Sequence, residues 1–425
     1  MTCTEGNGLA QSIAEAIARR SYGKLVAFLA VRTRDLAAAE DALSEAFAAA
    51  LADWPAHGCP DNPEAWLLTV ARRKAIDAHR VGRREVSAAD LFPDDPTLIE
   101  SFPADSTSSP AAVFEIPDQR LALMFACAHP AIDPAIRAPL ILQLVLGLDA
   151  ARIASAFLTS PAAMGKRLVR AKQKIRDAGI PFDVPSRDEL PTRVESVLAA
   201  IYAAFTEGWP DPSAADTVRS DLTAESIFLA RLIHELLPSE PEAYGLLALM
   251  LYVQARRRAR RSPQHDYVPL ASQDTALWDT AAIREAESIL GNAGALQRIG
   301  RYQLEAAVQS AHIARRLTGQ NNWTAIVQLY NALFVLTQSP VVAINRALAI
   351  AEADGPAAGL AALESIQDDP RLAQYQPWWA ARADLLARTG DATAAHHAYD
   401  IAMGLESDPA VRRFLQLRQS SLTRS

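Results

Sequence analysis

Four basic side chains between residues 166 and 174 have the types and the spacing needed to bind a nucleic acid. On a helical wheel they fall within roughly a 100° arc, and no acidic residue interrupts them. Arginine and lysine on such a face can bind both phosphates and guanine edges in the major groove of DNA. The four residues are Lys166, Arg167, Arg170 and Lys174.

The stretch from 147 to 176 predicts a short helix, a turn and a second helix that carries this basic face. Apolar residues recur behind it at the helical period, namely Met164, Leu168, Ala171 and Ile175. Ile153, Ala154 and Phe157 give the first helix its own apolar side, and Thr159-Ser160-Pro161 is a helix-starting turn. The pattern favours a helix-turn-helix that reads the major groove. The alternative is an amphipathic helix with a solvated basic side.

A second basic helix is predicted upstream, opened by Asn62-Pro63-Glu64 and running to about Arg84. Its apolar side contains Leu67, Val70, Ala71 and Ala78. A polar and basic cluster lies opposite and is extended by two further arginines. These residues are Thr69, Arg72, Arg73 and Arg80, then Arg83 and Arg84.

An amphipathic helix is predicted before it, over residues 32 to 54, with Leu36, Leu43, Phe47 and Leu51 facing inward. Its exposed face carries acidic residues that suit a contact with a basic protein surface. They are Glu40, Asp41 and Glu45. The alternative is that these acids only solvate an alanine-rich helix.

In order and spacing, these segments resemble the extracytoplasmic-function group of sigma-70-like initiation factors of bacterial RNA polymerase. The run from Ala39 to Phe47 resembles the helix of that family that binds the polymerase clamp. Trp66 to Asp77 resembles the helix that reads the minus-ten element, and Gly147 to Arg176 resembles the reader of the minus-thirty-five element. The resemblance implies two partners, core RNA polymerase and promoter DNA.

The resemblance also implies a role for each matching residue. Glu40, Asp41 and Glu45 would bind the clamp, whereas Thr69, Arg72, Arg73, Arg80, Arg83 and Arg84 would hold the minus-ten strand. The loop from Trp54 to Asn62 would receive an unstacked base. Lys166, Arg167, Arg170 and Lys174 would dock the minus-thirty-five element. Ser44, Arg73, Ala163 and Gly165 depart from the family pattern, and the last two remove side chains that could read bases.

The segment between the two basic helices contains no Lys or Arg from Glu85 to Gln119 and is acidic and proline-rich. This composition predicts a flexible tether. The resemblance implies that it threads a polymerase channel, with Asp94, Asp95 and Asp105 mimicking phosphates.

The composition of the chain limits its function in several ways. At 425 residues it is long enough for several domains, and a net charge of -7 confines nucleic-acid binding to local basic faces. No long apolar run or leader pattern is present, so we expect a cytoplasmic protein with no membrane contact. Cys3, Cys59 and Cys127 lack metal-site spacing, and phosphate-loop, dinucleotide and zinc-protease motifs are absent. We expect no cofactor, no metal and no enzymatic activity.

The C-terminal half shows helical periodicity broken by Gly, Pro and Asp. Residues 376 to 409 resemble a tetratricopeptide repeat, and residues 340 to 366 form a similar unit about 36 residues earlier. The packing positions of the repeat over residues 376 to 409 are occupied by Trp379, Ala383, Leu386, Gly390, Ala395, Tyr399 and Ala402. Such repeats bind proteins or peptides, and the alternative is a purely supporting helical body. The arginine-rich run from Arg256 to Arg261 reads as a solvated helix end, or else as a contact for DNA or polymerase.

The sequence therefore predicts an all-α protein. Its expected parts are a polymerase-binding and minus-ten domain over 1–84, a linker over 85–117, a helix-turn-helix domain over 118–180 and a tetratricopeptide-like domain over 187–420. We interpret the chain as a sigma factor with a regulatory or partner-binding extension. A stand-alone helix-turn-helix regulator with a repeat-type sensor remains open, as does a helical scaffold without nucleic-acid function.

Overall fold

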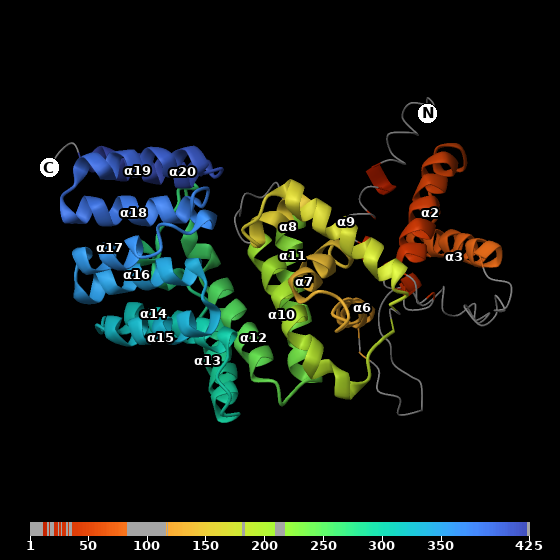
Figure 1. The fold of residues 1–425 in the computed structure, drawn as a ribbon, viewed down its shortest axis with the longest axis horizontal. Coiled ribbons are helices and arrows are strands. Elements are labelled where there is room, and N and C mark those ends of the chain that lie inside the picture. The colour runs from red at the N-terminus through yellow and green to blue at the C-terminus, as the bar shows by residue number, and fades with distance from the viewer. Residues whose placement is uncertain are drawn as a thin grey trace. The chain divides into compact units, whose positions relative to one another are not determined.

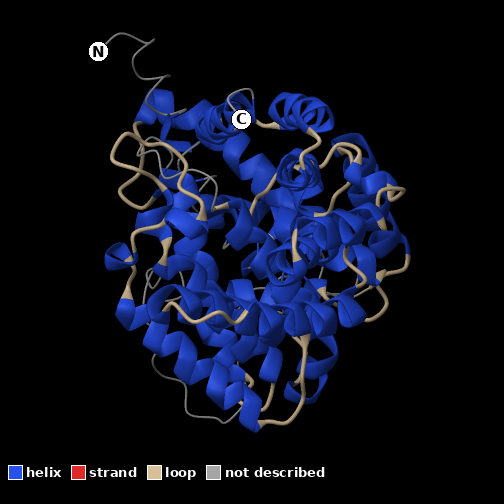
Figure 2. Ribbon diagram, turned by 90° about the vertical axis from the view of Figure 1, so that its left-hand side faces the viewer, coloured by secondary structure: helices blue, strands red, loops and turns tan. Residues whose placement is uncertain are grey.

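The computed structural model describes residues 36–82, 118–180, 183–208 and 217–422, together with Ile116 and several positions between 12 and 33. Throughout this part of the chain the regular secondary structure is helical, and Arg261 and Tyr267 form only an isolated bridge (Figure 2). The predicted all-α fold is confirmed. The predicted linker, except Ile116, lies outside the described residues, as do Arg83 and Arg84.

Contacts divide the chain into two compact units, and the division falls inside helix α11 (Thr217–Leu236), between Leu229 and Ala230. This point lies later in the chain than residue 187, where the sequence places the start of the last domain. The four predicted domain boundaries stay predictions.

The first unit opens with a helix pair, α2 (Leu36–His57) and α3 (Pro63–Gly82), which pack against each other (Figure 1). Asn62 accepts the Ala65 N–H at 3.1 Å and Pro63 occupies the first position of α3, so the predicted helix start is confirmed. Inside the pair, the rings of Trp54 and Trp66 meet edge to face with centroids 5.6 Å apart.

The buried face of α2 differs from the predicted one. Leu43, Ala46, Ala50 and Trp54 form a stripe with helical spacing, whereas Leu51 is 46% exposed because it lies off that stripe. The sequence therefore placed Leu51 wrongly. It also began the following loop too early, since Trp54 is buried within α2 and the turn begins only at Gly58, with φ of +87°.

Four short helices follow, each started by a side chain that accepts an N–H from the first turn. They are α6 (Gln119–Cys127), α7 (Pro134–Leu144), α8 (Ala150–Ala156) and α9 (Pro161–Asp177), capped by Asp118, Asp133, Asp149 and Ser160. Helix α10 (Leu190–Glu207) packs on α6, α7 and α8. Its buried Arg193 donates to the Phe125 carbonyl at 3.3 Å and to Glu189 at 2.8 Å, which fixes α10 to α6.

The second unit is a series of antiparallel helix pairs (Figure 1). The helices are α12 (Pro241–Ala255), α13 (Thr280–Ala295), α14 (Arg301–Thr318), α15 (Trp323–Thr337), α16 (Pro340–Asp354), α17 (Pro356–Glu364), α18 (Gln376–Thr389), α19 (Ala392–Leu405) and α20 (Pro409–Leu422). Short 3₁₀ turns occur in this unit at Arg257–Arg260, Leu270–Ser272, Thr275–Leu277 and Pro370–Leu372, and one occurs in the first unit at Arg187–Glu189.

Small residues let these helices approach closely. A Cβ at Gly359 would lie 2.4 Å from the Cβ of Ala351, so only glycine fits where α17 crosses α16. Ala383, Ala395 and Tyr399 are buried in the core between α18 and α19, at the positions predicted for a repeat. At the start of α18 it is Trp378 that is buried, while the predicted Trp379 is only partly covered.

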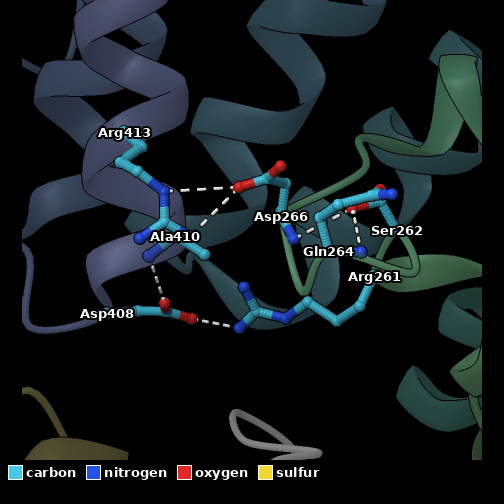
Figure 3. Close-up of polar contacts among 7 residues, drawn as sticks. All are labelled: Arg261, Ser262, Gln264, Asp266, Asp408, Ala410 and Arg413. Atoms are coloured by element: carbon cyan, nitrogen blue, oxygen red, sulfur yellow. Dashed lines mark hydrogen bonds and ion pairs between the residues drawn. The ribbon is translucent and has the colours of Figure 1, made fainter.

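A long segment between α12 and α13 uses the arginine-rich run for structure. Arg261 forms an ion pair with Asp408, and Arg413 of α20 reaches Asp266 at 3.0 Å (Figure 3). Burial alone would raise the pKa of Asp408, but hydrogen bonds from Arg261 and the Ala410 N–H bring that pKa below its ordinary value. The interpretation of this run as a solvated helix end is wrong for Arg261, whose side chain is 14% exposed.

Candidate nucleic-acid and polymerase interface

Helix α9 presents the basic face that the sequence predicts, and nothing in the described part of the chain neutralises it. All four of its predicted residues are exposed and none forms an ion pair with another described residue. Behind them, Met164 and Leu168 are each 1% exposed and Ile175 is 7% exposed. The face is therefore rigidly backed, solvated and cationic, which suits binding to phosphates and base edges.

The turn before α9 sets the direction of this helix. Ser160 caps it by accepting the Ala163 N–H at 3.3 Å, and Pro161 stands at its first position. Ile153 and Ala154 bury the apolar side of α8. The two helices form where the sequence predicts them, and the positive end of the α9 dipole adds a preference for anions.

The basic face predicted on α3 is less free. The Thr69 hydroxyl donates to the Ala65 carbonyl at 2.8 Å, Arg72 is partly buried and has an interaction partner, and Arg73 is exposed. Arg80 belongs to α3, but its side chain lies outside the described part of the structure. The structure thus leaves Arg73 exposed to solvent and engages Thr69 and Arg72.

The three acidic residues predicted for polymerase binding have different surroundings. Asp41 is exposed, and Glu45 forms a solvent-exposed ion pair with Lys74 at 3.0 Å, a pair worth no more than about 1 kcal/mol. Glu40 is covered: the Lys172 ammonium donates to its two carboxylate oxygens at 2.9 and 3.1 Å. The side chains of this pair are only 21% and 26% exposed.

The residues that surround Glu40 could not be predicted from the sequence. Tyr22 lies beside it, and burial, with the negative charge of Glu40, raises the Tyr22 pKa to about 12. Cys127 of α6 is fully buried near both members of the pair, and burial raises the pKa of its thiol. Because Lys172 follows Glu40 by 132 residues, no local pattern could indicate their contact.

Among the described residues, no group of three or more His, Cys, Asp or Glu side chains comes together that could hold a metal ion. Among the described helices, none is both long enough and apolar enough to cross a membrane.

The second unit has an apolar hollow of about 380 Å³ on its surface, lined by residues of α14, α15 and the turn before α14. Ile299 is 76% exposed and Val335 72% exposed, which is unusual for aliphatic side chains of this size. The lining residues are Ile299, Leu304, Asn331, Ala332, Val335 and Leu336.

Comparison with known proteins places two segments of the chain in described families. Residues 17–85 match Sigma-70 region 2, and residues 193–294 match a family of unknown function, DUF6596. An uncharacterized protein of Rhizobium meliloti (strain 1021) is 36% identical over 390 residues, covering 92% of this chain and 91% of the relative. No solved structure matches the chain. The chain belongs to one family with that rhizobial protein, and its N-terminal segment is similar to sigma-70 region 2.

Proposed function

We propose that the protein is a sigma factor of the extracytoplasmic-function type, which directs core RNA polymerase to specific promoters and performs no enzymatic reaction itself. The match to sigma-70 region 2 over residues 17–85 is the observation that carries this proposal. The exposed basic face of α9 supports it, because a second DNA-binding element is needed to hold an upstream promoter sequence. A sigma factor acts together with RNA polymerase, so the proposal includes a cytoplasmic location and requires neither a cofactor nor a metal.

In this proposal the site residues act in four groups. Glu40, Asp41 and Glu45 bind the polymerase clamp. The turn from Gly58 to Asn62 receives the unstacked base. The minus-ten strand is held by Thr69, Arg72, Arg73, Arg80, Arg83 and Arg84, and the minus-thirty-five element by Lys166, Arg167, Arg170 and Lys174.

The helix pairs of the second unit are proposed to form a tetratricopeptide-like extension that binds a protein or peptide partner and regulates initiation. The apolar hollow around Val335 supports this role, since exposed apolar patches mark interaction surfaces.

The test of the sigma-factor proposal is binding to purified core polymerase, followed by a gel shift with promoter fragments. We expect the full chain to bind core polymerase and the resulting complex to bind promoter DNA, whereas the chain alone binds duplex DNA weakly. A double variant, Glu40→Lys with Asp41→Lys, should abolish capture of polymerase.

The runner-up is a stand-alone regulator that binds DNA through α9, and the free basic face of that helix is the observation that favours it. Under this alternative the double variant leaves DNA binding intact, and the chain binds a palindromic duplex tightly without polymerase.

A further inference from the structure

The second unit contains a cluster of basic side chains that has no acidic partner within the described structure. Helix α14, which packs against both α12 and α15, contributes three of its members, and the fourth directly follows the last residue of α12 (Figure 1). We call these four residues the arginine–histidine cluster; they are Arg256, His312, Arg315 and Arg316. None of the three arginines forms an ion pair with another described residue.

Contacts between the helices bring the cluster together. The Arg256 guanidinium donates to the side chain of Gln309, which lies three residues before His312 on α14. The ring of His312 meets the ring of Trp323, the first residue of α15, with centroids 5.6 Å apart. The guanidinium carbon of Arg315 lies 4.6 Å from the centroid of the same Trp323 ring. One aromatic side chain thus supports both members of α14.

Several nitrogens of the cluster are buried and have no hydrogen-bond partner in the described structure. They are Nδ1 of His312 and the Nε atoms of Arg315 and Arg316. Arg316 uses another of its nitrogens to donate to the Gln273 carbonyl at 2.9 Å. A buried polar nitrogen without a partner is unfavourable, and a buried cation more so. Because each residue as a whole is only partly covered, the cluster also borders the surface.

The positive charges of the cluster act on one another. Burial, reinforced by Arg315 and Arg256, lowers the pKa of His312 to about 4. Burial, reinforced by Arg260, lowers the pKa of Arg256 to about 10. In both cases positive charge accumulates where no described carboxylate offsets it. A bound anion would supply the missing negative charge and accept hydrogen bonds from the unpartnered nitrogens.

We propose that the arginine–histidine cluster binds the phosphate group of a small molecule. A guanidinium presents paired N–H groups that match the oxygens of a phosphate, and a phosphate monoester carries about −1.5 to −2 charges at pH 7. A dianion therefore offsets the arginines of the cluster better than a single carboxylate does. This inference goes beyond the proposed function, because it gives the second unit a small-molecule ligand, and it does not depend on polymerase binding.

The test is isothermal titration of the full chain in chloride buffer with two probes, inorganic phosphate and glycerol 3-phosphate. We expect saturable binding, and the tighter probe distinguishes free phosphate from an organic phosphate as the ligand. Arg315→Gln should weaken binding about tenfold or more, because it removes charge-assisted hydrogen bonds. Arg301→Gln is the matched control: it removes the same charge from an exposed position at the other end of α14, and its affinity should stay within twofold of the wild type.

A thermal melt in chloride buffer shows whether Arg315→Gln folds. We expect a melting temperature no lower than that of the wild type, because the substitution relieves repulsion within the cluster. A second measurement needs no arginine variant: phosphate should raise the pKa of His312, followed by NMR of its ring resonance, which is identified by its loss in His312→Phe.

Three results would each overturn the inference. They are the absence of saturable binding of both probes, equal affinity of Arg315→Gln and the wild type, and a His312 pKa that phosphate leaves unchanged. None of these results bears on the sigma-factor proposal, which is tested with polymerase and promoter DNA.

Discussion

Helix α9 and the segment from Arg256 to Arg261 are both densely basic in sequence, yet the fold treats them in opposite ways. The basic side chains of α9 proposed to bind DNA stay exposed and unpaired within the described structure. In the second unit Arg261 is paired with Asp408, and Arg256 donates to Gln309 from a largely covered position. Burial lowers the pKa of Arg256 to about 10. One region leaves its cations exposed to solvent, and the other uses them to stabilise its own fold.

The two regions differ in whether the helix that carries the basic residues also has a buried apolar face. Arg and Lys on α9 alternate with an apolar face that packs at the helical period, so the basic side must point to solvent. The run from 256 to 261 follows the end of α12 and folds into a 3₁₀ turn with no such division of faces. Basic residues close together in sequence thus indicate nucleic-acid binding only when the helix that carries them has its own buried side.

The largest expected effect tests the free region. We expect the triple variant Lys166→Ala, Arg167→Ala, Arg170→Ala to weaken binding of the polymerase complex to promoter DNA about 100-fold or more, because each such contact contributes roughly 1–3 kcal/mol. The melting temperature should stay unchanged, since these side chains hold no other part of the fold. A gel shift and a thermal melt measure the two quantities. Unchanged promoter binding would remove the contrast between the regions.

The next effect tests the self-stabilising region. We expect Arg261→Ala to lower the free energy of unfolding by about 2 kcal/mol, because Asp408 is left partly buried without its partner. Arg258→Ala is the control, since it removes the same charge from an exposed position of the same run. Denaturant titration compares them, and equal stability of the two variants would contradict this account of the segment.

The close packing of the second unit gives an effect whose sign depends on position. Gly359→Ala should destabilise the protein by about 1–3 kcal/mol, because its Cβ would overlap Ala351. Gly291→Ala, in α13 where a Cβ would meet nothing within 4 Å, should stabilise it by up to about 1 kcal/mol. Thermal melts of both variants check the signs, and stabilisation by Gly359→Ala would show that α16 and α17 do not cross this closely.

A further expected effect depends on pH. Burial, reinforced by the positive charges of Arg315 and Arg256, lowers the pKa of His312 to about 4 from its ordinary value of 6.5. The unfolded chain therefore takes up this proton first as the pH falls, and the stability due to neutral His312 is complete above pH 6.5 and lost towards pH 4. The loss is at most about 1.4 kcal/mol per pH unit.

His312→Phe keeps an aromatic ring against Trp323, whose centroid lies 5.6 Å from that of His312. This variant should lose less of its melting temperature between pH 7 and pH 5 than the wild type does. If both proteins show the same pH profile, then burial and the charges of Arg315 and Arg256 do not oppose protonation of His312.

The sequence was sufficient wherever periodicity decides the structure. The all-α fold, the start of α3 after Asn62, the cap of α9 at Ser160 and the buried backing of Leu168 all follow from local patterns, and the structure confirms them. The predicted inward face of α2 is wrong at Leu51. Alanines supply most of the buried stripe, and a prediction that follows the largest apolar side chains selects Leu51 instead of them.

Contacts between distant residues were beyond the reach of the sequence. The partners Lys172 for Glu40 and Asp408 for Arg261 are brought together only by tertiary folding, across 132 and 147 residues. Both pairs turned charges that look free in the sequence into structural ones. The four exposed positions on α9 kept their predicted character because no acid on another helix reaches them in the described structure.

Run-off transcription with purified core polymerase on pooled genomic fragments tests the central claim most directly. With the full chain present, we expect transcripts of defined length that disappear when Lys166, Arg167 and Arg170 are all changed to Glu. If the chain yields no transcripts beyond those of core polymerase alone, or if the triple variant yields the same transcripts in the same amount, the proposed role in promoter recognition is contradicted.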